Sequence, residues 1–204
     1  MLTLYHSPDS RSSRFIWLLE ELGAEYELAY VDIPRWSGRG RPDPGNPHPD
    51  KRVPALLHDG QLVTESAAIA LYLTDAFPQA GLGAPVGDPQ RGAYLSWLAF
   101  YAGEIELAFG MFRRGWLDQD PHRALAQDHE RIQNRVLSAL DQGPYLIGTQ
   151  FTAADILVAS PYQWVRDFGP PSRLIDEWLA RLAERPAAVR AVALDRPKAS
   201  APTG

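Results

Sequence analysis

The sequence predicts two parts: an α/β domain with the element order βαβ–ββα over residues 1–77, and an all-α helical bundle over residues 89–204. Short β-forming runs and helical patterns alternate in the first third of the chain. Glycine and proline gather in residues 78–88, as is typical of a linker. Beyond this linker only helical periodicity remains, which predicts a helical bundle.

The first 33 residues predict a strand, a helix and a second strand. Residues 2–5 have the composition of a short strand, and residues 26–33 are again rich in β-forming side chains. Between them, apolar residues from Phe15 to Leu22 recur at helical spacing, and Gly23 stands where a helix should end. Such a unit usually implies two parallel strands joined by a crossover helix.

Residues 34–52 interrupt this pattern. Six of the chain's 18 prolines fall between Pro34 and Pro54, so the stretch cannot be a continuous helix or strand. Its arginines are expected to lie mostly on a solvated surface loop. A hairpin of residues 54–57 and 61–64 follows, and Asp59-Gly60 is a strong turn signal. A helix is then expected from Ser66, as N-cap, to about Phe77.

The second half contains several helix start and stop signals. Asp88-Pro89 and Asp120-Pro121 each place a capping residue before a proline at the first helical position. The first of these helices is expected to break near Gly110 or Gly115. Residues 152–155 have the spacing of a capping box, with the following helix ending before Pro161. A last amphipathic helix covers about residues 174–182.

Composition excludes several classes of function. The chain has 204 residues, a formal net charge of −5 and no cysteine. Disulfides, thiolate–zinc sites and a cysteine nucleophile are therefore excluded. The acidic balance argues against nucleic-acid binding, and the five histidines show no metal-ligand spacing. The sequence shows no signal peptide, and its apolar run from Ala67 to Leu73 is too short to span a bilayer. We therefore expect a soluble, cytoplasmic protein without a metal or a membrane partner.

Two local features favour a peptide-like ligand. Val53-Pro54 begins a strand, and a proline there leaves backbone groups of Val53 available to an extended ligand. Glu65-Ser66 opens a helix, whose free N–H groups favour a carboxylate, while Glu65 could hold an ammonium group. Taken alone, Val53-Pro54 is better explained by a structural role, because proline before a strand is common, and for Ser66 alone helix capping is favoured.

The serine-rich turn at residues 7–14 precedes the first helix and suits a ligand thiol. An unperturbed thiol pKa of about 8.5 must fall by roughly 2 units, near 2.7 kcal/mol, for the thiolate to dominate at neutral pH. A hydrogen bond to a charged group supplies about 1.5–3 kcal/mol, and a helix terminus roughly 0.3–1 kcal/mol. Together they reach the required size without a general base. A plain N-capping turn would also explain these serines.

These motifs, taken in order, resemble the glutathione transferase family over nearly the whole chain. They are Leu4-Tyr5-His6-Ser7-Pro8, Leu18-Leu19-Glu20-Glu21-Leu22-Gly23, Asn46-Pro47, Arg52-Val53-Pro54-Ala55-Leu56, Asp59-Gly60, Glu65-Ser66, Ala68-Ile69, Tyr72-Leu73, Phe151-Thr152-Ala153-Ala154-Asp155 and Arg185-Pro186-Ala187. The resemblance implies a bacterial cytosolic type, with a thioredoxin-like domain that binds glutathione and a helical domain that shapes the site of the second substrate.

The resemblance also implies roles for individual residues. Val53, followed by a cis Pro54, would pair its backbone with the cysteinyl part of glutathione, and Glu65 and Ser66 would hold the γ-glutamyl end. The glycyl carboxylate would face Arg52, or alternatively Lys51 or His48. Thr152 and Asp155 would cap a buried helix.

The activating residue is expected to be a serine rather than a cysteine. Serine-type members place it four residues ahead of an arginine, and counting back from Arg14 gives Ser10. Ser7 and Ser12 remain alternatives, and Tyr5 is more consistent with the core.

The hydrophobic co-substrate would meet aromatic side chains of the helical domain, at least half of which we expect to be core. They are Trp97, Tyr101, Phe109, Phe112 and Trp116. The resemblance implies a homodimer that conjugates glutathione to an electrophile, in detoxification. Two alternatives are a glutathione-dependent isomerase or disulfide reductase on the same fold, and a non-catalytic relative that binds a protein or hydrophobic ligand.

Overall fold

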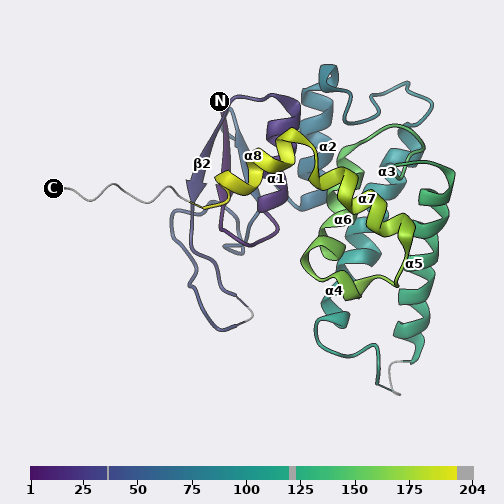
Figure 1. Cartoon of the computed structure of the whole chain (residues 1–204). Coiled ribbons are helices and arrows are strands. Elements are labelled where there is room, and N and C mark those ends of the chain that lie inside the picture. Colours follow the sequence, from purple (N-terminus) through teal and green to yellow (C-terminus); the bar gives the residue numbers. More distant parts are fainter. Residues whose placement is uncertain (36, 120–122, 197–204) are drawn as a thin grey trace. The chain divides into compact units, whose positions relative to one another are not determined.

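The computed structural model describes residues 1–35, 37–119 and 123–196 (Figure 1). Within them the chain forms two compact units. The first comprises Met1–Ile69 together with the chain from Arg185, and the second comprises Ala70–Glu184. The expected domain ranges 1–77 and 89–204 differ from these units at two places: residues 70–77 group with the second unit, and the last helix groups with the first.

The first unit is built on a mixed sheet with the strand order β2-β1-β3-β4. Its strands are β1 (Leu2–His6), β2 (Tyr26–Tyr30), β3 (Ala55–His58) and β4 (Gln61–Thr64). β1 runs parallel to β2, and β3 runs antiparallel to both β1 and β4. The predicted order βαβ–ββα is therefore confirmed, including the crossover between the parallel pair.

The strand ends follow from their backbone partners. Asp59 and Gly60 have φ angles of 48° and 83°, the backbone that a two-residue type I′ turn requires. β2 ends at Tyr30 rather than at Ile33. The N–H of Val31 still bonds the carbonyl of His6 at 2.9 Å, and beyond it side-chain carboxylates take over the backbone N–H groups. Asp43 accepts from the N–H of Asp32 at 3.3 Å, and Asp32 accepts from the N–H of Ile33 at 2.9 Å.

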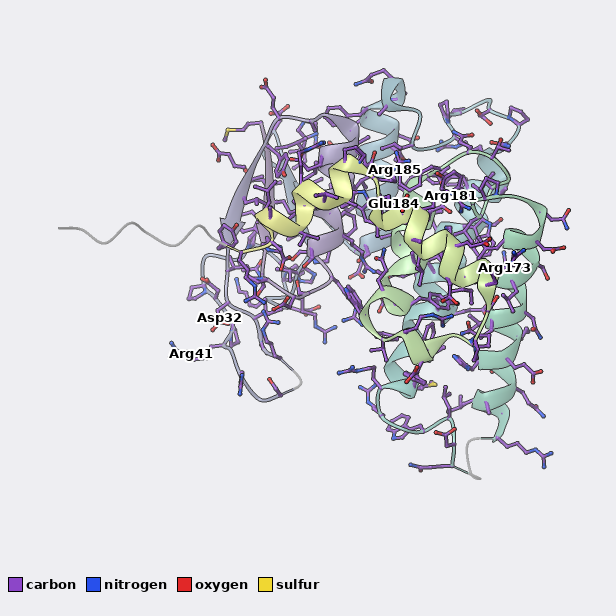
Figure 2. All side chains as sticks on the ribbon, viewed as in Figure 1. Asp32, Arg41, Arg173, Arg181, Glu184 and Arg185 are labelled. Carbon is purple, nitrogen blue, oxygen red and sulfur yellow. The ribbon has the colours of Figure 1, made fainter. Side chains whose placement is uncertain are left out.

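The two carboxylates, Asp32 and Asp43, also organise the proline-rich segment after β2. Asp32 accepts from the N–H of Arg41 at 2.8 Å, and Asp43 accepts from the N–H of Gly45 at 2.8 Å. Asp32 and Arg41 are labelled in Figure 2. The described residues of this segment thus form no strand or helix, as predicted, and side-chain-to-backbone bonds replace the missing ladder.

Helix α1 (Ser13–Leu22) packs against α8 (Pro186–Leu194) within the first unit (Figure 1). Arg185 forms two hydrogen bonds to the carboxylate of Glu21, at 2.5 and 2.8 Å, and Arg190 bonds Glu20 at 2.6 Å. α1 ends at Gly23, whose φ of 62° is the left-handed conformation expected of a helix C-cap. These ion pairs explain why the last helix belongs to the first unit.

Helix α2 (Ser66–Ala76) begins at Ser66 itself, so the residue before it is Glu65 rather than the expected serine. Glu65 has a φ of 68°, a left-handed conformation that costs a non-glycine residue roughly 1–2 kcal/mol. Backbone strain of this kind is concentrated at functional sites.

The described part of the second unit is helical, as predicted. Its elements are η1 (Pro78–Ala80), α3 (Arg91–Phe100), the π-helical turn η2 (Tyr101–Ile105), α4 (Glu106–Phe112), α5 (Arg123–Gln142), α6 (Ala153–Trp164), η4 (Arg166–Phe168) and α7 (Arg173–Ala183). α3, η2 and α4 form one nearly continuous helix that ends at Phe112, between the two expected break points. The expected start signal Asp120-Pro121 lies outside the described residues.

Helix α6 contradicts one boundary prediction, because it runs through Pro161 to Trp164 instead of ending before the proline. A proline inside a helix leaves the carbonyl four residues earlier without its usual N–H partner. Here the hydroxyl of Ser160 donates to that carbonyl, of Leu157, at 2.8 Å. The local serine therefore compensates for the bond that the proline removes.

The predicted capping role of Thr152 and Asp155 is confirmed at the start of α6. One carboxylate oxygen of the fully buried Asp155 accepts from the N–H of Thr152 at 2.9 Å. The other accepts from the N–H of Leu146 at 2.9 Å and from the indole of Trp178 at 3.1 Å. Burial nevertheless raises the pKa of Asp155 to about 6, because desolvation outweighs these bonds.

Candidate active site

The serine-rich turn lies in the first unit between β1 and α1, at the positive end of that helix. The Ser10 hydroxyl donates to the carbonyl of Ser7 at 2.6 Å and lies 2.8 Å from the Ser12 hydroxyl. Ser10 is partly exposed, whereas Ser7 and Ser12 are buried. Of the three candidate serines, Ser10 is therefore the one that a ligand reaches most directly.

The two buried serines have partners within the protein. The Ser12 oxygen lies 2.8 Å from Nδ1 of the buried His6 and accepts from the N–H of Ser7 at 3.2 Å. The Ser7 hydroxyl accepts from the guanidinium of Arg35 at 2.8 Å. Both therefore support the turn from the inside.

Arg35 is a functional candidate that the sequence did not reveal. It belongs to the proline-rich segment whose arginines were expected to be mostly solvated, yet it is only partly exposed. Besides Ser7, its guanidinium bonds the carbonyl of Pro8 at 2.7 Å and that of Asp9 at 3.4 Å. It places a fixed positive charge against the serine turn. No periodicity or turn signal marks such a contact, which spans about 28 residues of sequence.

The start of β3 has the geometry that the resemblance implies. The Val53–Pro54 peptide bond is cis. Val53 is buried and lies just before β3. The pairing of β3 with β1 ends at the pair Tyr5–Ala55. The backbone of Val53 is therefore outside the regular sheet pairing, at the end of β3 next to the cis bond.

The segment before Val53 is held by a buried asparagine. The Asn46 side chain donates to the carbonyl of Arg52 at 3.0 Å and accepts from the N–H of His48 at 3.0 Å. Lys51 donates from its ammonium to the Asn46 carbonyl at 2.7 Å, whereas Arg52 is exposed. His48 is buried, and its Nδ1 accepts from the N–H of Asp50 at 3.1 Å. Arg52 is thus the most accessible of the three candidates for the glycyl carboxylate.

The starts of α1 and α2 lie next to each other. The buried guanidinium of Arg14, in the first turn of α1, donates to the hydroxyl of Ser66, the first residue of α2, at 3.0 Å. Glu65, beside Ser66, is exposed. Two helix N-termini therefore meet at this point, and both favour anionic groups.

The five aromatic candidates lie in the second unit, and three of them are core residues. Trp97, Tyr101 and Phe109 are at most 7% exposed, Phe112 is half-buried, and Trp116 is 39% exposed. The rings of Phe109 and Phe112 both pack edge-on against Phe168, with centroids 5.3 and 5.6 Å away. As expected, more than half of this set stabilises the helical core.

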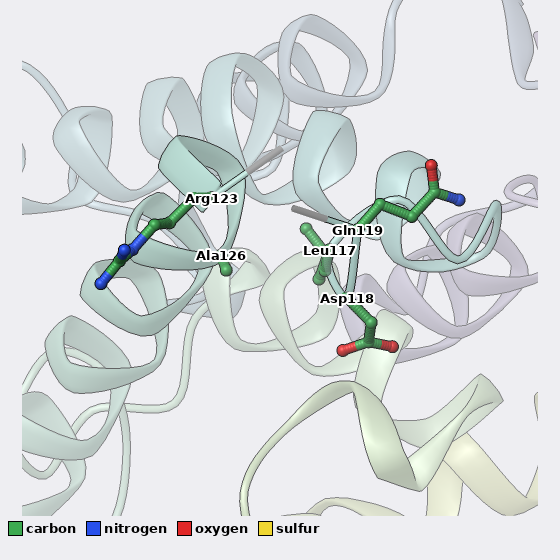
Figure 3. Close-up of a pocket in the computed structure, with 5 residues that line it drawn as sticks. All are labelled: Leu117, Asp118, Gln119, Arg123 and Ala126. Atoms are coloured by element: carbon green, nitrogen blue, oxygen red, sulfur yellow. The ribbon is translucent and has the colours of Figure 1, made fainter. Parts of the chain in front are cut away.

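A pocket of about 270 Å³ in the second unit contains none of these aromatic residues (Figure 3). Its lining residues are Leu117, Asp118, Gln119, Arg123 and Ala126. Among residues 1–35, 37–119 and 123–196, no cluster of three or more potential metal ligands is present. Over the same residues no helix is both long and apolar enough to cross a membrane.

Comparison with known proteins identifies the family. The glutathione S-transferase N-terminal domain matches residues 1–75, and the glutathione S-transferase C-terminal domain matches residues 100–186. Glutathione S-transferase GstA of Escherichia coli O157:H7 is 30% identical over 192 residues, which cover 91% of this chain and 94% of that protein.

Comparison with solved structures identifies the same family. A glutathione transferase from Methylococcus capsulatus superposes with a TM-score of 0.75 at 30% identity, over 96% of this chain and 98% of that one. A sphingomonad glutathione S-transferase complexed with glutathione gives a TM-score of 0.74 at 28% identity, over 95% and 98% of the two chains. This chain belongs to the glutathione S-transferase family of enzymes.

Proposed function

We propose that this chain conjugates the thiolate of glutathione to a hydrophobic, electrophilic co-substrate. The observation that carries the proposal is the hydrogen bond from Arg14 to Ser66, which joins the N-termini of α1 and α2. Two adjacent helix starts suit a ligand with two anionic groups, such as a thiolate and an α-carboxylate. The sphingomonad relative, which is complexed with glutathione, supports the same ligand here.

In this proposal the thiol lies at the start of α1 beside Ser10, whose hydroxyl donates to the thiolate. The guanidinium of Arg35, bonded to Ser7 and Pro8, adds a positive charge to the same turn. A charge-assisted hydrogen bond contributes about 1.5–3 kcal/mol, which is the size that thiol activation requires. Ser10 need not lose its proton or form a covalent bond.

The rest of glutathione would extend over the surface of the first unit. Val53 would pair its backbone with the cysteinyl part, beside Pro54. Ser66 and the N–H groups of α2 would take the γ-glutamyl carboxylate, and Glu65 the ammonium. Arg52 would face the glycyl carboxylate, because the ammonium of Lys51 already donates to the Asn46 carbonyl.

The chemical step needs only the thiolate and the electrophile. The sulfur lone pair forms a C–S bond to the electrophilic carbon, and the leaving group departs with the electrons of its own bond. Of the aromatic candidates in the second unit, the two least buried are Phe112 and Trp116, and we assign these to the co-substrate. We further propose a cytoplasmic homodimer with a role in detoxification. Light scattering on the purified protein tests the dimer.

The function is tested by calorimetry with reduced glutathione, while thiolate absorbance is followed against pH on the same sample. We expect binding below millimolar concentration, a bound-thiol pKa well under the free value, and a thioether product with an activated aryl halide. If the protein binds glutathione but yields only isomerised substrate or oxidised glutathione, the isomerase or reductase alternative replaces conjugation. If millimolar glutathione does not bind, the non-catalytic alternative is correct.

A further inference from the structure

The buried His6, the last residue of β1, uses both ring nitrogens beneath the serine turn. Its Nδ1 lies 2.8 Å from the Ser12 hydroxyl, and its Nε2 lies 2.8 Å from the main-chain carbonyl of Asp195. The imidazole is fully buried and packs edge-on against the ring of Tyr30, at 5.4 Å. The contact with Asp195 joins residues 189 apart in the sequence.

These partners determine the tautomer of His6. A carbonyl oxygen only accepts, so Nε2 carries the proton that the Asp195 carbonyl receives. Burial lowers the pKa of His6, so the ring is neutral at physiological pH. Nδ1 then has a lone pair and no proton, and the Ser12 hydroxyl must donate to it.

The hydrogen bonds continue from Ser12 to Ser10. Because the Ser12 proton points to His6, the Ser12 oxygen is an acceptor for the Ser10 hydroxyl 2.8 Å away. The Ser10 proton has a second acceptor, the Ser7 carbonyl at 2.6 Å, and rotation about one bond moves it between the two. A continuous donor chain therefore leads from the partly exposed Ser10 through Ser12 to Nδ1 of His6.

We propose that His6 is the proton acceptor of a two-serine relay that deprotonates the glutathione thiol. This inference rests on the proposed function. The thiol gives its proton to the Ser10 oxygen, Ser10 gives its own to Ser12, and Ser12 gives its own to Nδ1. One S–H bond breaks, one N–H bond forms, and each serine ends with a single proton. After the transfer each serine O–H points in the opposite direction, so the Ser10 O–H donates to the new thiolate.

The surroundings of His6 suit a transient imidazolium. A carboxylate oxygen of Asp195 lies 3.6 Å from Nε2, is buried, and accepts no hydrogen bond within the described part of the chain. The other carboxylate oxygen of this partly exposed side chain accepts from the N–H of Asp9 at 3.1 Å. The buried oxygen would gain by facing a cation. Proton transfer to His6 would supply that cation.

Before a thiolate forms, burial is the largest influence on the pKa of His6 and lowers it, as does the charge of Arg35, while the hydrogen bond to the Asp195 carbonyl and the charges of Asp195 and Asp9 raise it. The negative charge of a thiolate at Ser10 would raise the pKa of His6 and so stabilise the imidazolium.

Proton counting tests the relay directly. Glutathione is titrated into the protein at about pH 7.5 in buffers of different ionisation enthalpy, and the thiolate is followed by absorbance. If His6 keeps the thiol proton, the wild-type protein releases far less than one proton to the buffer for each thiolate that forms. Release of a full proton per thiolate overturns the proposal. Absence of binding or of a thiolate in wild-type protein is a failure of the proposed function instead.

The variant His6→Asn separates basicity from hydrogen bonding. Its amide oxygen can still accept from Ser12, but it cannot take a proton. We expect a folded protein with glutathione affinity within about threefold of wild type, a bound-thiol pKa raised by a unit or more, and full proton release for any thiolate formed. kcat should fall about tenfold at neutral pH with little change in KM for glutathione. A folded His6→Asn protein with wild-type thiolate fraction and proton count overturns the relay. If the variant does not fold, the wild-type proton count decides.

Discussion

Arg14 donates a hydrogen bond to the hydroxyl of Ser66 across 52 residues of sequence, and thereby holds the first turn of α1 against the first residue of α2. Both side chains belong to the segments from which the glutathione site was expected. Arg14 is only 5% exposed, so it acts as a structural support beneath the proposed γ-glutamyl site rather than as a surface charge.

Replacing Arg14 should therefore affect both stability and binding. Arg14→Met keeps the apolar stem and removes the guanidinium, with an expected loss of about 1.5–3 kcal/mol in unfolding free energy, the range for a hydrogen bond to a charged group. Glutathione affinity should fall as well, because Ser66 loses its anchor. Denaturant unfolding and calorimetry measure both. Arg11→Gln, an exposed change in the same turn, is the matched control and should alter stability little. Wild-type stability of Arg14→Met would contradict this role.

The strained backbone of Glu65 separates binding from stability. Glu65→Ala should weaken glutathione binding at least tenfold without unfolding the protein, since the ligand ammonium loses its carboxylate. Glu65→Gly should lose as much affinity but gain up to about 1 kcal/mol of stability over the alanine variant, because glycine tolerates the φ of 68°. Calorimetry and thermal unfolding test the pair, with the exposed Glu25→Ala as control. If both Glu65 variants bind glutathione as tightly as the Glu25→Ala control, the γ-glutamyl assignment is wrong.

Arg35 should tune the thiol through its charge. Arg35→Gln removes the guanidinium that bonds Ser7 and Pro8, and the bound-thiol pKa should rise by roughly half a unit to one unit, or about 1 kcal/mol of lost thiolate stabilisation. Absorbance against pH measures the shift. Arg39→Gln changes an exposed arginine of the same segment by the same chemistry. Only Arg35→Gln should raise the pKa of the bound thiol. An equal rise in both variants would show that Arg35 has no special role.

The two ion pairs between α1 and α8 should differ in strength. Arg185 makes a two-point contact with Glu21, whose side chain is only 10% exposed, whereas the Arg190 side chain is 53% exposed. We expect Arg185→Ala to cost about 2–3 kcal/mol, since it removes the cation that faces a largely buried carboxylate and leaves that carboxylate the indole of Trp17 as a donor. Arg190→Ala should cost about 0–1 kcal/mol, as exposed pairs do. Urea unfolding of both variants distinguishes them, and the reverse order would contradict this account.

The raised pKa of Asp155 predicts that the stability of the protein depends on pH. Its pKa is raised from 3.8 to about 6 in the folded protein, so the folded state binds the proton more tightly than the unfolded state. Protonation of Asp155 therefore contributes to the free energy of unfolding. This contribution is fully present below about pH 4 and is lost as the pH rises through 6. The loss is on the order of 3 kcal/mol. Asp155→Asn cannot titrate, so the unfolding free energy of wild type relative to this variant should fall between pH 4 and 6. A constant difference over that range would contradict the raised pKa.

Local chemistry was enough to predict most of the secondary structure from the sequence. The helix stop at Gly23, the turn at Asp59-Gly60 and the cap between Thr152 and Asp155 depend on neighbours within a few residues, so their signals lie in short stretches of sequence. The end of α6 was mispredicted at Pro161, because a side-chain bond from Ser160 overrode the rule that proline stops a helix.

Only the tertiary structure decided which polar side chains meet. The sequence by itself determined that a serine turn precedes α1 and that Glu65-Ser66 stands at the start of α2. It did not reveal that Arg14 joins the two, that Arg35 returns to Ser7, or that His6 bonds both Ser12 and Asp195. Local periodicity records which face of an element is buried, but not which distant side chain a buried polar group contacts. Because a buried polar group must find a hydrogen-bond partner, that pairing is set by the packing of the whole unit.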